Sequence, residues 1–147
     1  MATISFKDYY INEFSYKEND NFDSKTENLD ITLDFNAVVN ISKEDILVNL
    51  SCELGEEIKE ECPFVANLSM NAYFGYEVDR TSIKDVELFK KMTSQNVVAI
   101  LYPYLRSAVS EMILKTNKFP PYVLPVANIV KMMEDENKIK VFEFMEE

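Results

Sequence analysis

Residues 96–106 read NVVAILYPYLR, and residues 118–125 read KFPPYVLP. The first segment has the apolar spacing of a helix but contains Pro103, and the second is an apolar loop held extended by prolines. A proline inside a helix removes one backbone hydrogen bond and costs about 3 kcal/mol. Because this proline is kept beside Tyr102, Tyr104 and Arg106, we expect the helix to be kinked and the kink to be used.

The sequence around this motif predicts helices. Apolar residues recur at three-to-four spacing from Val97 to Ile113, which is the stripe of a helix packed on one side. Thr93 or Ser94 can cap the start of this helix, with a separate short helix before it. After the proline loop, residues 126–135 read as a second, shorter helix.

Upstream of the helices the period of the pattern changes to two. Alternating apolar and polar residues predict strands over residues 3–16, 29–41, 46–54 and 64–76. Each strand then has one buried and one wet face, and the order of four consecutive strands is typical of a meander. We therefore expect an α+β fold, in which a four-stranded antiparallel sheet carries a long kinked helix and a shorter C-terminal helix on one face.

The chain of 147 residues has the length of a single domain. We expect the sheet within residues 1–78 and the helices with the proline loop within residues 82–135. The tail, residues 136–147, alternates like a strand from Lys138, but the pattern does not place it in the sheet. No apolar run approaches the ~20 residues that a membrane span needs, so we expect a soluble, cytoplasmic chain.

The charge of the chain limits its partners. It has 26 acidic and 15 basic residues, a formal net charge of −11. Phosphate backbones and anionic membrane surfaces are repelled by such a chain, whereas electropositive partners are attracted. The plain alternative is that the acidic residues only maintain solubility.

Groups that carry chemistry are scarce in this sequence. It contains no His, the commonest general base and metal ligand. The two cysteines, Cys52 and Cys62, are too few for a four-ligand zinc site, and we expect them to be reduced, with a disulfide as the alternative. We also find no Gly-rich phosphate loop. The sequence predicts no enzyme, no metal and no cofactor.

A surplus of apolar and aromatic side chains is the main functional signal. Several of them lie on strand faces or in loops where a small core has no room: Val38, Val65, Tyr73, Tyr122 and either Tyr9 or Tyr10. Exposed apolar surface of this kind indicates an interface or a binding groove. Burial between copies of the chain is the simpler explanation for any one of these residues.

The two quoted segments resemble the signature of the SecB export chaperones, which reads FPYAR and then FPxLxLxPVNF. Residues 102–106, YPYLR, stand for the first part. Phe119 and Pro120, with Leu124 and Asn128, stand for the second part, and residues 64–74 are similar to a SecB strand. The resemblance extends to about residue 130.

This resemblance implies the SecB fold, a homotetramer built as a dimer of dimers, and ATP-independent holding of unfolded polypeptides in protein export. The implied partners are unfolded or precursor polypeptides and the SecA motor. The implied client groove consists of Phe14, Tyr16, Phe22, Leu33, Phe35, Phe119 and Tyr122. The implied oligomer interface consists of Ala66, Leu68 and Met70, and the implied motor-docking surface of Glu13, Val65 and Asn67.

Two departures from the family pattern count against docking to the SecA motor. Lys17 stands where the family carries an acidic residue on the first strand, and Asn67 stands where another acid is usual.

Two further functions stay open. The match is that of a divergent relative, and a second reading within the same fold is a dedicated chaperone of one partner, such as the antitoxin of a toxin–antitoxin–chaperone system. A small-ligand carrier or an enzyme with a pocket between sheet and helices is the third reading, and the missing His and Gly-rich loop argue against it.

Overall fold

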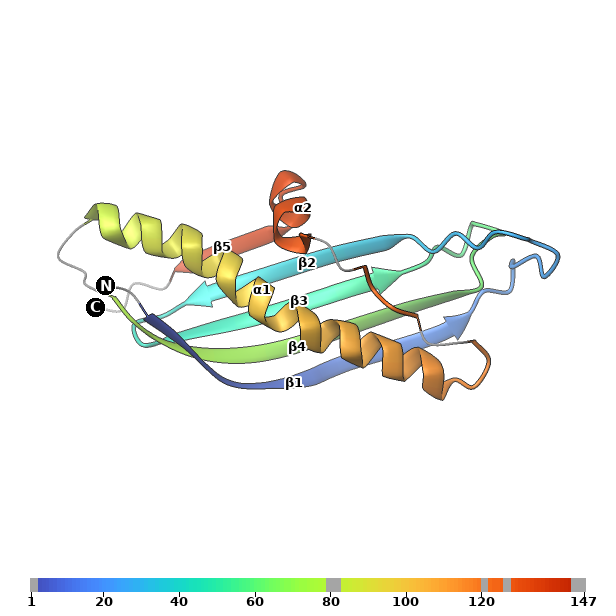
Figure 1. Cartoon of the computed structure of the whole chain (residues 1–147), viewed down its shortest axis with the longest axis horizontal. Helices are drawn as coiled ribbons and strands as arrows, with labels where there is room; N and C mark the ends of the chain where they lie inside the picture. The colour runs from blue at the N-terminus through green and yellow to red at the C-terminus, as the bar shows by residue number, and fades with distance from the viewer. Residues whose placement is uncertain (1–2, 79–82, 120–121, 126–127, 144–147) are drawn as a thin grey trace.

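The structure is a computed structural model that describes residues 3–78, 83–119, 122–125 and 128–143. Its elements are β1 (Thr3–Glu18), β2 (Leu33–Ile41), β3 (Asp45–Leu54), β4 (Phe64–Glu77), α1 (Ile83–Lys115), α2 (Ile129–Asp135) and β5 (Ile139–Glu143). The strands form one sheet, and α1 crosses one face of it diagonally (Figure 1). The predicted α+β class is confirmed.

The strands lie in the order β1-β4-β3-β2-β5. β2, β3 and β4 form the predicted antiparallel meander. β1 does not pair with β2. It pairs antiparallel with β4, because the long polar connection over residues 19–32 lets the chain cross to the other edge. β5 pairs parallel with β2. The four-stranded, wholly antiparallel meander is therefore corrected to a five-stranded mixed sheet.

The tail that the sequence pattern could not place supplies β5. It is directed by the C-terminal end of α2, where Asn137 has a left-handed conformation with φ of 56° and the Lys138 N–H donates to Met133 O at 2.7 Å. The Ala37 N–H then donates to Lys138 O at 2.9 Å and starts the pairing of β5 with β2. The alternation from Lys138 predicted a strand, but its neighbour depends on α2, which is a tertiary contact.

Alternation along the central strands puts one apolar row of each strand on the helix-covered face. On β2 this row consists of Phe35, Ala37, Val39 and Ile41, all at most 2% exposed. β3 and β4 contribute matching buried rows. The opposite face is rich in asparagine and serine. The sheet therefore has the one buried and one wet face that the period of two predicted.

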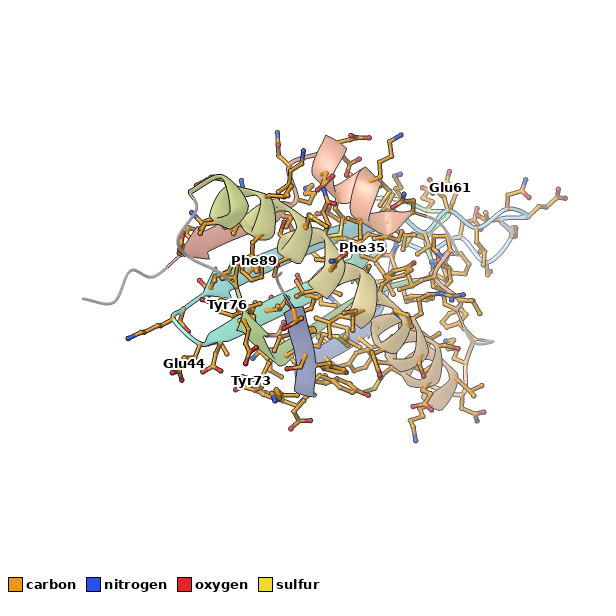
Figure 2. All side chains as sticks on the ribbon, turned by 60° about the vertical axis from the view of Figure 1, so that its left-hand side comes forward. Phe35, Glu44, Glu61, Tyr73, Tyr76 and Phe89 are labelled. Carbon is orange, nitrogen blue, oxygen red and sulfur yellow. The ribbon has the colours of Figure 1, made fainter. Side chains whose placement is uncertain are left out.

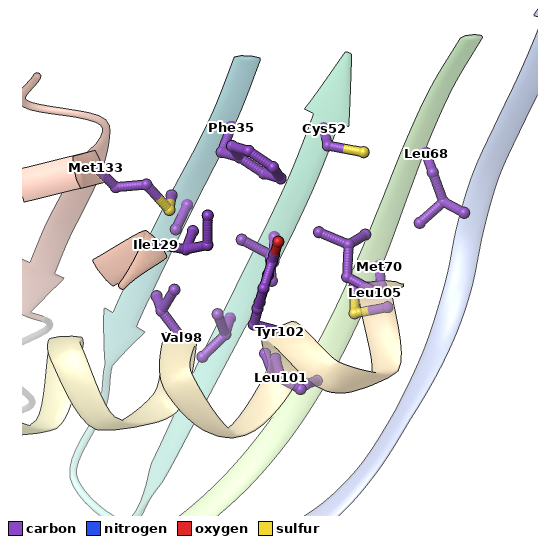
Figure 3. Packing of buried hydrophobic residues seen from close by; sticks show 14 of the residues in the cluster. Phe35, Cys52, Leu68, Met70, Val98, Leu101, Tyr102, Leu105, Ile129 and Met133 are labelled. Carbon is purple, nitrogen blue, oxygen red and sulfur yellow. The ribbon is translucent and has the colours of Figure 1, made fainter. Parts of the chain in front are cut away.

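α1 fills the space above the buried rows with an apolar stripe: Val97, Val98, Leu101, Leu105, Val109 and Ile113. Figure 3 shows Leu101, Tyr102 and Leu105 of α1 among the sheet residues, with Ile129 and Met133 of α2 beside them. Complete burial of one such aliphatic side chain contributes about 1.5–3 kcal/mol. The helix–sheet contact is thus the core of the subunit.

α1 is one helix, not the two that the sequence predicted. Thr93 and Ser94 are buried inside it instead of capping a second helix. The Ser94 hydroxyl donates to Lys91 O at 2.9 Å, so its hydrogen bond is made within the helix. The helix also continues through Pro103. Pro103 and Ala99, whose carbonyl loses its partner, are both exposed, so water can bond this carbonyl.

One part of α1, Val86–Lys115, is long and apolar enough to cross a membrane, judged by length and composition alone. This corrects the expectation that no apolar run approaches that length. A core helix passes the same test, and the buried residues of α1 pack on the sheet.

The second helix is shorter than predicted. α2 begins at Ile129, and the Asn128 side chain caps it by accepting a hydrogen bond from the Lys131 N–H at 3.1 Å. The first two residues of the predicted helix, 126 and 127, lie outside the described residues, as do Pro120 and Pro121 of the loop.

The residues assigned to an oligomer interface lie in the core. Ala66, Leu68 and Met70 are 2%, 2% and 0% exposed beneath α1. Val65 and Asn67, on the alternate parity of β4, face away from the helix. Because the folded subunit leaves no surface at the three buried positions, their assignment to an interface is corrected to a role in the core.

Leu68 and Asn67 give a direct test of this correction. Leu68→Ala should lower the free energy of unfolding by about 2–5 kcal/mol, because it leaves a cavity under α1. Asn67→Ala, the control on the outer face, should cost less than about 1 kcal/mol. Urea unfolding at two protein concentrations measures both. A Leu68→Ala variant with unchanged stability and a smaller mass by light scattering would return Leu68 to an interface.

Candidate functional site

Four of the residues predicted to form a client groove lie in two adjacent rows across the sheet. The pairing of neighbouring strands puts Tyr16 and Leu33 in one row, linked through Leu54 and Ala66. Phe14 and Phe35 occupy the next row in the same way. Residues distant in sequence are therefore gathered at the end of the sheet where β1 ends and β2 begins.

The loop after α1 adds its aromatic residues to this end of the sheet. The ring of Phe64 lies 5.6 Å from that of Tyr16 and 5.4 Å from that of Phe119, so the three rings form a continuous cluster. Tyr122 also packs against the core. We call the half-buried members of this region the aromatic end: Phe14, Tyr16, Leu33, Phe119 and Tyr122.

Two predicted groove residues differ from this group. Phe35 is 2% exposed and its ring meets that of Tyr102 edge-on at 5.9 Å, so it is corrected to a core residue beneath the aromatic end. Phe22 is half-buried in the β1–β2 connection. Asn19 ties that connection to the turn before β4, because its side-chain amide donates to Lys59 O and Cys62 O at 3.0 and 2.8 Å.

Tyr102 and Arg106 hold the loop over residues 122–125 against α1. The Tyr102 hydroxyl donates to Pro125 O at 2.7 Å, and Arg106 Nε donates to Leu124 O at 3.1 Å. The two side chains are four residues apart and therefore share one face of the helix. We call this pair of contacts the loop clamp. It gives a structural use to Tyr102 and Arg106, two of the three residues noted near Pro103.

Neighbouring residues of the clamped loop differ in exposure. Leu124 is fully buried, Tyr122 is half-buried and Val123 is 62% exposed. Lys118, nearer the start of the loop, forms an ion pair with Glu18 at 2.6 Å and so ties the loop to the end of β1. Both ends of the loop are fixed next to the aromatic end.

The tyrosine hydroxyls of this region stay protonated near neutral pH. Burial raises the pKa of Tyr102 to about 12 and also raises the pKa of Tyr16 and of Tyr122. A tyrosine in this state presents an apolar ring with a neutral hydrogen-bonding tip. Such side chains suit binding of apolar or aromatic segments rather than proton transfer.

A second exposed apolar surface follows β1 and α1. The rings of Tyr9 and Tyr104 lie 4.7 Å apart, and the ring of Phe6 lies 5.5 Å from that of Tyr104. Tyr9, Ile11, Ile100 and Tyr104 are 36–38% exposed. We call these four residues the β1 patch. β1 is also an edge strand, and register shifts between Phe6 and Asp8 and between Ile11 and Glu13 make its edge irregular.

The predicted motor-docking residues lie on the outer face of the sheet. Val65 and Asn67 alternate with the buried row of β4, and Glu13 pairs with Ser69 of the same outer parity. The side chain of Asn67 donates to Ser15 Oγ at 3.2 Å. Lys17, which departs in sign from the family pattern, forms an ion pair with Glu57 at 3.4 Å. Docking itself stays a prediction.

Hydrogen-bonded side chains run across the outer face. Asn49 Nδ2 donates to Ser69 Oγ at 2.8 Å and to Asn71 Oδ1 at 2.9 Å, and Asn71 Nδ2 donates to the Tyr10 hydroxyl at 3.2 Å. Tyr73 lies beside this network on the side of the sheet away from α1 (Figure 2). A hollow of about 230 Å³ opens between Tyr73 and Asn49. The surplus aromatic residues Tyr10 and Tyr73 are thus exposed, as the sequence predicted.

The cysteines do not form a reactive site. Cys52 and Cys62 are free and buried. Burial raises the pKa of the Cys52 thiol to about 12, so this side chain is a thiol rather than a thiolate at neutral pH. Among the residues that the structure describes, no group of three or more His, Cys, Asp or Glu side chains is placed to hold a metal ion.

A solved structure of a Mycobacterium tuberculosis protein has a fold similar to that of this chain. This protein is the Rv1957 SecB-like chaperone, in complex with a ChAD peptide from the Rv1956 HigA1 antitoxin. The TM-score is 0.64, over 84% of this chain and 90% of that chain, at 19% identity. The present chain has the SecB-like fold. The resemblance noted from residues 102–106 and the proline loop is thus confirmed at the level of the fold.

No family model matches the chain. A protein of Methanocaldococcus jannaschii, described as uncharacterized, is 27% identical over 141 residues, which cover 95% of this chain and 88% of that protein. A Streptococcus agalactiae protein of unknown function aligns over 85% of this chain and 98% of that chain, with a TM-score of 0.43 and 11% identity.

The β1 patch was only partly visible in the sequence. The sequence marked either Tyr9 or Tyr10 as surplus. It included Tyr104 in the apolar stripe of the predicted helix, but Tyr104 is 38% exposed. Ile100 and Tyr104 are four residues apart and extend the apolar stripe sideways toward β1. The unusual width of that apolar stripe was the sequence signal that some of its residues would be exposed.

Tyr102→Phe tests the loop clamp. It removes only the hydroxyl that bonds Pro125 O, so we expect a loss of about 1 kcal/mol in stability. Amide exchange of Val123 and Leu124 should become faster, while exchange in β3 stays unchanged. Tyr104→Phe, which keeps the same ring on the exposed flank, is the control. Unchanged exchange at both loop residues in Tyr102→Phe would show that the loop is held by other contacts.

Proposed function

We propose that the protein is an ATP-independent holding chaperone that binds unfolded or precursor polypeptides at the aromatic end. The aromatic end carries this proposal, because it gathers half-buried aromatic and aliphatic side chains from β1, β2 and the loop after α1. Aromatic side chains of this kind bind varied apolar segments without reading a sequence. The SecB-like fold supports the same function.

Charge and loop structure support binding of non-native chains. A formal net charge of −11 attracts basic segments and keeps a loaded complex soluble. The loop clamp fixes Tyr122 and Val123 beside the aromatic end, so the binding surface is preformed on one side.

A dedicated role for one partner is the second candidate. One observation favours it: the SecB-like chaperone of Mycobacterium tuberculosis was solved with a peptide from an antitoxin. For the present chain we extend this to a single cognate polypeptide, held in the same region. A general role in protein export, in the cytoplasm and with delivery to the SecA motor, is the other form of the proposal. The departures at Lys17 and Asn67 favour the dedicated form.

We also propose a homotetramer built as a dimer of dimers, with the β1 patch as one of its contact surfaces. The patch joins four apolar side chains to an open sheet edge, and both features favour association. It replaces the three core residues of β4 as the candidate interface.

Aggregation assays with several unrelated denatured proteins test the proposal and separate its two forms. Leu33→Asp should weaken suppression of aggregation at least about tenfold, since it puts a charge into the aromatic end. Leu47→Asp is the matched control, because Leu47 is an exposed leucine on the outer face of β3. Protection of several proteins indicates a general holdase, and protection of one cognate chain indicates a dedicated one. A wild-type protein that protects none would refute both.

Tyr104→Glu tests the β1 patch. The variant should have a smaller mass in solution than the wild type, because charges are depleted from the cores of such interfaces. Ile58→Glu is the control, since Ile58 is 86% exposed and lies far along the chain from the patch. Light scattering or native mass spectrometry measures both variants. Equal masses for wild type and Tyr104→Glu would exclude the patch from the assembly.

A further inference from the structure

β5 is attached to the sheet mainly through its backbone and its ends. Val141 is 40% and Phe142 53% exposed, so these two side chains gain little from burial. Only Ile139 packs against the core cluster. Ion pairs hold the two ends: Lys138 contacts Asp34 at 3.1 Å, and Glu143 contacts Lys90 of α1. An element with so little apolar burial opens at low free-energy cost.

The space around β5 is not filled. A hollow of about 360 Å³ separates it from α1, lined by Glu87, Lys90, Lys91, Ser94, Val141 and Glu143. Another hollow, of about 550 Å³, lies beyond its first residue, between Asp34, Glu136 and Lys138. Close packing, which keeps core strands in place, is therefore missing between β5 and α1.

The backbone hydrogen-bonding groups of β2 point alternately to β3 and to β5, according to whether the residue number is even or odd. Gly55 N–H donates to Thr32 O at 2.9 Å, so even-numbered residues of this segment direct their backbone groups to β3. Ala37 N–H donates to Lys138 O at 2.9 Å, so odd-numbered residues direct theirs to β5. If β5 leaves, the amides of Ala37, Val39 and Ile41 lose their partners while those of Val38 and Asn40 keep theirs.

We propose that β5 is a displaceable strand that holds the Ala37–Ile41 edge of β2 in reserve for an extended segment of a partner polypeptide. This inference rests on the proposed function, because that partner is the bound client. The incoming segment needs a free N–H at alternate residues, so it contains no proline, and β-branched or aromatic residues suit it best.

An incoming strand has an energetic advantage over β5. It can run antiparallel to β2, and antiparallel pairing is slightly more stable per residue than the parallel pairing that β5 makes. It can also fill the hollow beside α1 with a larger side chain than Val141. Displacement therefore exchanges a loosely packed strand for a better-fitting one.

Two variants of the full chain change the attachment of β5 in known directions, and a third controls for the change in charge. Glu143→Lys breaks the ion pair with Lys90 and opens β5. The double variant Lys90→Glu with Glu143→Lys restores the pair with reversed charges. Glu111→Lys makes the same charge change on the exposed side of α1, away from β5, and controls for net charge.

An engineered disulfide holds β5 on β2 instead. Asn40 and Phe142 are register partners on the outer face, so Asn40→Cys with Phe142→Cys places two sulfurs across the strand pair. The native cysteines are buried away from this pair: Cys52 lies in the core on the other face of the sheet, and Cys62 lies in the turn before β4. Reduction of the disulfide allows β5 to open again, so the reduced form of the same variant is the control.

The probes are a short synthetic peptide of alternating threonine and valine and the same peptide with a central proline. In Glu143→Lys, amide exchange at Val39 and Ile41 should be about threefold faster, as expected for a partly exposed ion pair, with Val38 and Asn40 unchanged. Affinity for the proline-free peptide should rise by the same factor, because only the open state binds it. The double variant should return both quantities to the wild-type values.

The oxidised disulfide variant should lose binding of the proline-free peptide and recover it on reduction. Equal binding before and after reduction, or faster exchange in Glu143→Lys without tighter binding, would overturn the role of β5. These results are independent of the holding assay. Suppose the wild-type protein suppresses aggregation and the disulfide variant binds the peptide equally before and after reduction. The proposed function then stands, and only the displaceable strand is refuted. If the disulfide controls peptide binding but the wild-type protein suppresses no aggregation, the displaceable strand stands and the holding function is refuted.

Discussion

The burial of one sheet face under α1 is the constraint on which the rest of the structure depends. It fixes the parity of β2, β3 and β4, because one residue in two must be apolar and fit beneath the helix. The same parity leaves an outer face that is rich in asparagine and serine. Because α1 crosses the sheet diagonally, it does not cover all corners of the face equally (Figure 1). The aromatic end and the β1 patch lie beside it, where apolar residues remain only partly buried.

Residues 101–106, LYPYLR, serve three purposes within one segment of helix. Leu101 and Leu105 face the core, Tyr102 and Arg106 donate to the loop carbonyls, and Pro103 is exposed. A proline is tolerated at this position because the carbonyl that it leaves unpaired is on the exposed side. Proline therefore limits neither the length of α1 nor its packing. The physical link between α1 and the aromatic end is the loop clamp.

Period-two alternation was sufficient to predict four strands, and three-to-four spacing was sufficient to predict the helix over the sheet. Neither pattern contains the order of strands, so the pairing of β1 with β4 and the parallel β5 could not be predicted from local sequence. The row pairing of Tyr16 with Leu33 follows from that order. Thr93 and Ser94 misled the prediction because a hydroxyl can either cap a helix or bond inside one. Leu68 shows that a role carried over from a family still has to agree with the burial of the residue in this chain.

β1 leaves the ribosome before its partner strand exists. β2, β3 and β4 can pair in sequence as they are made, whereas Phe6 must wait for Phe74, and Tyr16 for Ala66. Contacts between such distant residues slow folding, because a long loop has to close first. During synthesis the aromatic side chains of β1 are therefore exposed on an unpaired segment. In that interval the nascent protein itself presents an extended, aromatic, non-native chain.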